Sequence, residues 1–349
     1  MSTRIKKDIY IIFDCPEEKN DKKWLINEIS SQYQGKVHAV YAKQILSKIE
    51  RKNILGKIYT RMFKIIQVKS VLTRAKAEDV VICWDYLTGL YLNLFSVNNG
   101  NTINILSMNW LSPMKVKPSL YRKQELLIDN TKARIVVNSN DSIQKWCEYF
   151  QKDISDKMIC IPDVYDSDQE FSSPITKKNK YCFTGGMNNR NWKLLADAAL
   201  KLPEIEFVCI ALKDDFLSKV SSIPKNMVVM YEVPTDKYYK IMKDAYIVLL
   251  PLIEERVSGL INILKAAQQG VPCLVSNMRA TSQYYESVEG FVIDNECDSW
   301  VRIIKLWYSY SDEIYLNETK MFCDYIKAKF SPHEAAKHIL SVINHIDLQ

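Results

Sequence analysis

The sequence lacks most of the short motifs that identify an active site directly. The phosphate-binding patterns GxxxxGK[ST] and GxGxxG are absent, and no GxSxG-type nucleophile motif occurs. No group of His, Cys and Asp residues has metal-ligand spacing, and the DxD-like run Asp166–Asp168 lies in a polar connecting segment. The sequence therefore indicates neither a P-loop nor a serine nucleophile, and we expect no metal.

Cysteine-pairing motifs and long apolar runs are absent as well. The nine cysteines form no CxxC pair, and several lie in apolar runs, which is typical of reduced, buried thiols. No apolar stretch is long enough to span a bilayer, and the N-terminal MSTRIKKD lacks the apolar core of a signal peptide. These features predict a cytoplasmic protein.

Basic residues outnumber acidic ones in only one long segment. Residues 36–76 contain eleven Lys or Arg and a single acid, Glu50, whereas the rest of the chain is mildly acidic despite a net charge of +6. Apolar residues recur in the segment with roughly helical spacing. It either lies on an anionic membrane surface, peripheral at the inner face of the plasma membrane, or packs on a sheet with a solvated basic face. Few aromatics and no recognisable motif accompany it, so we do not expect nucleic acid as a partner.

Short apolar runs and amphipathic segments alternate along the 349 residues. This alternation and length predict an α/β protein with two doubly wound, Rossmann-like domains facing a cleft. We assign residues 1–165 to the first domain, 166–180 to a linker, 181–320 to the second domain, and 321–349 to helices returning to the first. The expected strands are Asp8–Phe13, Lys36–Tyr41, Asp79–Trp84, Thr102–Ser107, Ala133–Asn138, Lys157–Pro162, Tyr181–Thr184, Ile205–Ile210, Met227–Tyr231, Ala245–Leu250, Cys273–Val275 and Gly290–Ile293.

Two strand–turn–helix elements of the second domain predict an anion site. In YCFTGGMNNRNWKLLADAAL, Gly185-Gly186 ends a strand, and Arg190 and Lys193 lie near the helix start. In VLLPLIEERVSGLINILKAAQQGVPCLVSN, Ser258-Gly259 opens the helix. Glycines allow a ligand close to the backbone, and free amides at a helix start favour a phosphate.

Together these elements resemble the GT-B glycosyltransferases, especially the retaining family 4 and family 1-type group of bacterial polysaccharide synthesis. The resemblance rests on three segments, which cover about residues 181–277: FTGGMNNRNWKLLADAA, YEVPTDKYYKIMKDAYIVLLP and SGLINILKAAQQGVPCLVSN. The resemblance implies transfer of a hexose from a nucleotide diphosphate sugar to a saccharide or lipid-linked acceptor. It places this reaction in O-antigen or capsule synthesis, with retention of configuration and without a metal or other cofactor.

The resemblance also assigns roles to individual residues. It implies that Arg190 and Lys193 hold the donor diphosphate and that Glu254 or Glu255 lies near the sugar hydroxyls. The remaining donor-site positions are Gly185 and Gly186 in the first turn, Glu232 and Val233 beside the base, Ser258, Gly259 and Leu260 at the distal phosphate, and Lys265 at the ribose.

Two positions depart from the family pattern. The glutamate that usually binds ribose aligns with Lys265, which has no acceptor for hydroxyl groups, and its partner eight positions earlier aligns with Val257. These departures keep open a non-catalytic GT-B subunit that binds a partner or a glycan. A nucleotide-sugar epimerase is a weaker alternative, because three of the four histidines lie in the C-terminal tail.

In the first domain, aromatic and polar residues follow two expected strands, at Trp84-Asp85 and Asn109-Trp110. Strand ends of this kind are where an acceptor would bind, and Asp85 could assist proton transfer. The opposing interpretation is that both tryptophans belong to the core and that Asp85 caps a helix.

Overall fold

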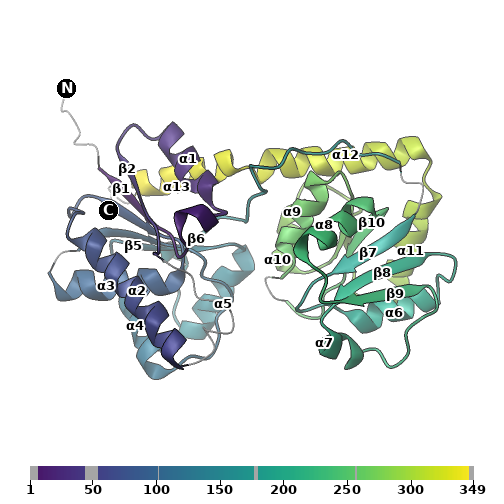
Figure 1. Ribbon diagram of the computed structural model, residues 1–349, viewed down its shortest axis with the longest axis horizontal. Helices are drawn as coiled ribbons and strands as arrows, with labels where there is room; N and C mark the ends of the chain where they lie inside the picture. The colour runs from purple at the N-terminus through teal and green to yellow at the C-terminus, as the bar shows by residue number, and fades with distance from the viewer. Residues whose placement is uncertain (1–6, 44–53, 101, 177–179, 256–257, 346–349) are drawn as a thin grey trace. The chain divides into compact units, whose positions relative to one another are not determined.

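The computed structural model describes residues 7–43, 54–100, 102–176, 180–255 and 258–345 (Figure 1). Internal contacts divide the chain into two compact units. Unit 1 consists of Met1–Pro162 and Pro332–Gln349, and unit 2 is Asp163–Ser331.

Unit 1 is built on a parallel sheet of short, mostly apolar strands. Its order is β2-β1-β3-β4-β5-β6, so the chain reverses direction across the sheet between β1 and β3. Four of the six strands are buried along their whole length, as expected for a sheet covered on both faces. The strands are β1 (Ile9–Ile12), β2 (Val37–Val40), β3 (Val80–Cys83), β4 (Asn104–Ser107), β5 (Ala133–Val137) and β6 (Met158–Cys160).

Helices cover this sheet in two layers. Helices α2, α3 and α4 lie side by side, and ring contacts of Tyr121 with Tyr149 and Phe150 continue the layer to α5. Helix α13, the last of the chain, packs against α1 on the opposite layer (Figure 1). The helices are α1 (Lys23–Gln32), α2 (Ile54–Leu72), α3 (Tyr86–Asn98), α4 (Pro118–Ile128), α5 (Asn140–Phe150) and α13 (Pro332–His345), with the 3-10 turns η1 (Glu17–Lys19) and η3 (Ser155–Lys157).

Unit 2 has a second parallel sheet, in the order β12-β11-β10-β7-β8-β9, which reverses between β7 and β10. Helices α6 and α11 pack together, and α9 contacts both α8 and α12. The elements are β7 (Tyr181–Gly185), α6 (Trp192–Leu200), β8 (Glu206–Ala211), α7 (Lys213–Leu217), β9 (Met227–Tyr231), α8 (Thr235–Asp244), β10 (Ile247–Leu250), α9 (Leu260–Gln268), β11 (Cys273–Ser276), α10 (Arg279–Ser282), η4 (Gln283–Tyr285), β12 (Val292–Ile293), α11 (Cys297–Ser309) and α12 (Asp312–Lys329).

The predicted fold class, two doubly wound α/β domains with a returning C-terminal helix, is confirmed. The units differ from the predicted boundaries at two places. The polar residues from Asp163 onward belong to unit 2, because Asp166 and Ser172 hydrogen-bond with Gln268 on α9. Helix α12 also belongs to unit 2, and only the chain after Ser331 returns to unit 1. Polar composition suggested a free connection, but side-chain amides bind this segment to a helix.

Candidate functional site

The candidate site lies at the carboxyl ends of β7 and β10, where the order of the unit 2 sheet reverses. Ligands of open α/β sheets bind at such switch points. The loops after the two strands are joined, because the Asn191 main-chain N–H donates to Pro251 O at 3.0 Å. The Asn189 side chain reinforces this by exchanging two hydrogen bonds with the Glu254 main chain, at 2.9 and 3.1 Å. Asn189 has a φ of 58°, a conformation that asparagine tolerates better than most residues.

Arg190 occupies the centre of these loops and is 2% exposed. Within the described residues, its guanidinium donates to main-chain oxygens, from Nε to Gly185 O at 2.9 Å and from Nη1 to Asn188 O at 3.0 Å. No carboxylate of the described residues forms an ion pair with it, and burial lowers the pKa of Arg190. An arginine nevertheless stays protonated in a protein, so this is a buried positive charge without an anionic partner.

Two glycines make room for this guanidinium. A Cβ at Gly186 would overlap Arg190 Nη2, and one at Gly259 would lie 3.0 Å from the same atom. Their φ angles are +145° and +79°, in the region that other residues rarely adopt. Gly186 and Gly259, two of the three glycines that the sequence analysis singled out, therefore leave the space that the guanidinium fills.

Tyr238 and Asn262 support the same turn, although the sequence analysis missed both. Asn262 Nδ2 donates to Gly185 O at 3.1 Å and to the Tyr238 hydroxyl at 3.0 Å. Burial raises the pKa of Tyr238 to about 12, so its hydroxyl keeps its proton at neutral pH. Tyr238 lies on α8 and Asn262 on α9, so only the tertiary fold brings them to Gly185.

The start of α9 presents main-chain N–H groups without a side-chain cap. Gly259 is the N-cap, and no side chain satisfies the first turn, which begins at the buried Leu260. Ser258 donates from Oγ to Asn188 O at 3.3 Å, which links this helix start to the loop that carries Arg190. The positive end of the helix dipole and the Arg190 charge therefore lie in the same region.

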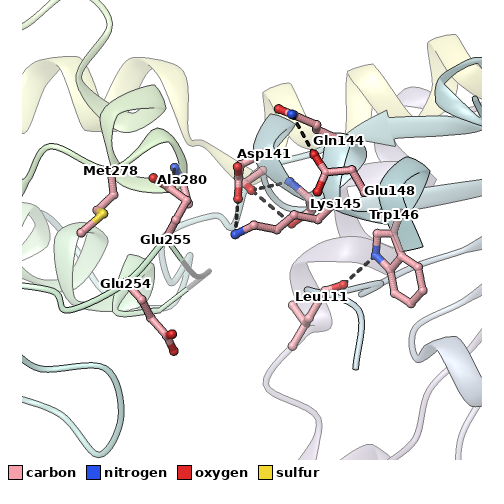
Figure 2. A network of polar contacts seen from close by, with 12 residues as sticks. Leu111, Asp141, Gln144, Lys145, Trp146, Glu148, Glu254, Glu255, Met278 and Ala280 are labelled. Carbon is pink, nitrogen blue, oxygen red and sulfur yellow. Dashed lines mark hydrogen bonds and ion pairs between the residues drawn. The ribbon is translucent and has the colours of Figure 1, made fainter. Parts of the chain in front are cut away.

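The two glutamates of the β10 loop have different surroundings. Glu255 accepts a hydrogen bond from the Ala280 main-chain N–H at 3.1 Å, at the start of α10 (Figure 2). Glu254 is exposed, and its carboxylate points away from Glu255 in Figure 2. Val257 lies outside the described residues.

The other predicted donor residues contact groups outside the Arg190 cluster. Lys193 is exposed and pairs with Asp197 at 2.8 Å, which raises the pKa of Lys193. Lys265 pairs with Asp166 at 2.9 Å and also lies over the Tyr239 ring. Glu232 has a φ of 53° at the end of β9, and Val233 packs against the core beside it.

In unit 1 the predicted strand-end residues have different environments. Trp110 is 1% exposed and belongs to the core, whereas Trp84 is half-buried and contacts Trp24 edge-on. Asp85 is the N-cap of α3: it accepts from the Thr88 main-chain N–H and pairs with Lys64 at 2.7 Å. A separate buried carboxylate, Asp141, pairs with Lys145 at 2.6 Å near the start of α5 (Figure 2).

Within the described ranges, no group of three or more His, Cys, Asp or Glu side chains is arranged to hold a metal ion. Over the same ranges, no helix combines the length and apolar character needed to cross a membrane.

No protein-family model matches the chain, and no curated protein is similar to it in sequence. Solved structures are similar over nearly its whole length. Anabaena HepE in complex with UDP has a TM-score of 0.67 at 12% identity, covering 97% of this chain and 100% of its own. Sucrose-phosphate synthase from Thermosynechococcus elongatus also reaches 0.67, at 8% identity with 98% and 100% coverage. A structure described as trehalose-6-phosphate from E. coli bound with UDP-2-fluoro glucose reaches 0.66, at 10% identity with 97% and 99% coverage.

The chain has the GT-B fold. At these identities the comparisons establish the fold, which the sequence motifs had predicted. In GT-B terms, unit 1 is the N-terminal and unit 2 the C-terminal Rossmann-like domain.

Proposed function

We propose that this GT-B protein is a glycosyltransferase that moves a hexose from a nucleotide diphosphate sugar to a saccharide or lipid-linked acceptor. The observation that carries the proposal is Arg190, a buried guanidinium without an acidic partner at the switch point of unit 2. A diphosphate would supply the missing negative charge. HepE and the E. coli structure hold UDP or a UDP-sugar analogue, which supports a uridine nucleotide as the first donor to test.

The arrangement suits stabilisation of a departing diphosphate. As the glycosidic bond to the donor breaks, negative charge grows on the distal phosphate. Arg190 and the uncapped N–H groups of Gly259 and Leu260 are held in place before the reaction, so they stabilise that charge without reorganising. We propose that this electrostatic stabilisation replaces metal chemistry and that the reaction retains anomeric configuration. Glu254 or Glu255 would contact the donor sugar, and Glu232 and Val233 the base through their backbone.

The acceptor side rests on unit 1. We propose that an acceptor sugar stacks on Trp84, which is half-buried at the switch point between β1 and β3 and has Lys22 Nζ 5.5 Å from its ring centroid. Asp85 would act there only after it gives up its hydrogen bond with the Thr88 main-chain N–H and its ion pair with Lys64. We place the reaction in bacterial surface polysaccharide synthesis, in the cytoplasm or at the inner face of the plasma membrane.

One observation favours a second function, a non-catalytic GT-B subunit that binds a partner or a glycan. By the family resemblance, Lys265 takes the position of a carboxylate that accepts hydrogen bonds from ribose, and its ammonium group pairs with Asp166. Such a subunit would bind nucleotide weakly and would not turn it over.

The test compares two buried arginines. Arg190→Met removes the charge in the site, whereas Arg134→Met removes that of an arginine that also donates to main-chain oxygens, in unit 1. Thermal stabilisation by UDP, GDP, ADP, CMP and dTDP is measured for each variant and for the wild type. We expect one nucleotide to stabilise the wild type and Arg134→Met but not Arg190→Met.

Turnover is then measured with the sugar conjugates of that nucleotide, with and without EDTA, and the anomer of the product is determined. Nucleotide binding without any hydrolysis or transfer would favour the non-catalytic subunit. An unchanged response in Arg190→Met would remove the assigned anion site.

A further inference from the structure

Helix α2 is held to unit 1 by a polar and apolar inner face. Lys64 Nζ pairs with Asp85 at 2.7 Å, and Gln67 Nε2 donates to Phe13 O at 2.9 Å. Val68 and Val71 are fully buried beside them. These contacts fix the rotation of α2 about its axis, so the opposite face of the helix is directed outward.

That outer face carries a stripe of large apolar side chains. Leu55, Ile58, Met62 and Ile66 are 78%, 48%, 54% and 52% exposed. Their spacings of three, four and four residues place them along one side of the helix. Single exposed apolar residues are ordinary, but a contiguous row of four marks an interaction surface.

All charged residues of the same helix are basic. Its sequence, ILGKIYTRMFKIIQVKSVL, contains no acidic residue, and Lys57, Arg61 and Lys69 are exposed; Arg61 and Lys69 lie nearest the apolar stripe, whereas Lys57 is in line with Lys64. Long basic side chains can extend from an apolar surface to charged groups at its edge. An apolar stripe accompanied by cations is typical of a helix that lies in the headgroup region of an anionic bilayer.

We infer that the outer face of α2 binds the surface of an anionic lipid bilayer, with its four apolar side chains among the acyl chains. A second copy of the chain fits this face less well, because two α2 helices paired across a two-fold axis would bring like charges together. This inference rests on the proposed function for its purpose, which is to bring the enzyme to a lipid-linked acceptor. Residues 44–53, which belong to the same basic segment, lie outside the described residues.

The experiment is flotation of the full chain with vesicles of 30% phosphatidylglycerol in phosphatidylcholine, and with vesicles of phosphatidylcholine alone. One variant removes the apolar stripe (Ile58→Ser, Met62→Ser, Ile66→Ser), and another removes the charges (Lys57→Gln, Arg61→Gln, Lys69→Gln). The matched control, Val97→Ser with Leu126→Ser, changes exposed apolar residues on α3 and α4 of the same unit.

We expect the wild type and the control to float with the anionic vesicles at low salt, and both α2 variants to lose at least tenfold in partitioning. Binding of the wild type should fall steeply at 0.5 M salt, since the charges act through a short screening length. No flotation of the wild type, or equal flotation of the α2 variants, would overturn the inference. A concentration-dependent dimer that the stripe variant abolishes, without vesicle binding, would assign the face to a second copy instead.

The nucleotide response of the same variants keeps the two proposals separate. If the α2 variants keep the thermal response to nucleotide but the wild type does not bind vesicles, only the membrane inference fails. If vesicles bind but no nucleotide stabilises any form, the proposed function fails and the lipid surface stands.

Discussion

The Arg190 guanidinium lies where it does because two residues beside it have no side chain. Gly186 and Gly259 both contact Nη2, and both have backbone angles that favour glycine. The charge alone would not make an anion site if a methyl group pushed the guanidinium away. If Arg190 binds a phosphate, as we propose, the affinity depends on the absence of these two side chains.

Gly186→Ala tests this dependence. We expect it to cost roughly 1–3 kcal/mol in free energy of unfolding, because alanine is strained at this φ, and to weaken nucleotide binding by about tenfold or more. Gly290→Ala is the matched control, since Gly290 also has a positive φ, +80°, but has no heavy atom within 4 Å of the added Cβ. Calorimetric titration with nucleotide should separate them; equal affinities in both variants would argue against the packing account.

Sequence motifs predicted Arg190 and its glycines because strand, turn and helix start are adjacent in the chain. They did not predict Tyr238, Asn262 or Asn189. Each of these three reaches a partner on a different loop or helix, and their residue types are common on helices and turns. Such contacts depend on how α8 and α9 pack, which local patterns do not specify.

At the level of elements, the carboxyl half of α9 and the segment that follows Asp163 form one assembly. Lys265 pairs with Asp166, and Gln268 hydrogen-bonds to the backbone of the segment at 2.8 and 3.0 Å. Burial alone would raise the pKa of Asp166, but the hydrogen bonds from Lys265 and the Asp168 main chain, with the Lys265 charge, lower it. The carboxylate is therefore favoured in the folded protein.

We expect Lys265→Met to destabilise unit 2 by less than about 1 kcal/mol at neutral pH, because the Asp166 side chain is 37% exposed. With the folded-state pKa lowered from 3.8, the stabilisation is present above the unfolded pKa and is lost as pH falls through the lowered value. The difference between wild type and variant in urea denaturation should therefore narrow as the pH falls below about 4. A gap that stays constant to pH 2 would contradict the assignment, and Asp166→Asn should reproduce the loss.

Elements were the most predictable scale. Every expected strand corresponds to an observed one, because short apolar runs between turn residues are a strong signal of a buried parallel sheet. The order of strands within each sheet does not follow from such runs. The assignment of the polar segment after Asp163 to unit 2 does not either, because it depends on side-chain contacts.

At the scale of the whole molecule, the chain leaves unit 1 after Pro162 and returns at Pro332. Unit 1 is consequently assembled from two distant parts of the sequence. Helix α13 packs on α1 and buries Ile339, Leu340 and Ile343.

Ending the chain at Phe330 should therefore destabilise unit 1 while sparing unit 2. Each buried aliphatic side chain of α13 contributes roughly 1.5–3 kcal/mol, so the loss should be several kcal/mol. We expect a separate, lower unfolding transition in calorimetry, with the nucleotide-dependent shift confined to the upper transition. One cooperative transition at the wild-type temperature would show that α13 is dispensable.

The return of α13 also sets an order on biosynthesis. Every residue of unit 2 is translated before Pro332, so unit 1 still lacks its last helix throughout the synthesis of unit 2. Until then, α1 lacks the helix that packs against it in the finished protein. We therefore expect aggregation and chaperone capture of the nascent chain to begin in its N-terminal part, unit 1.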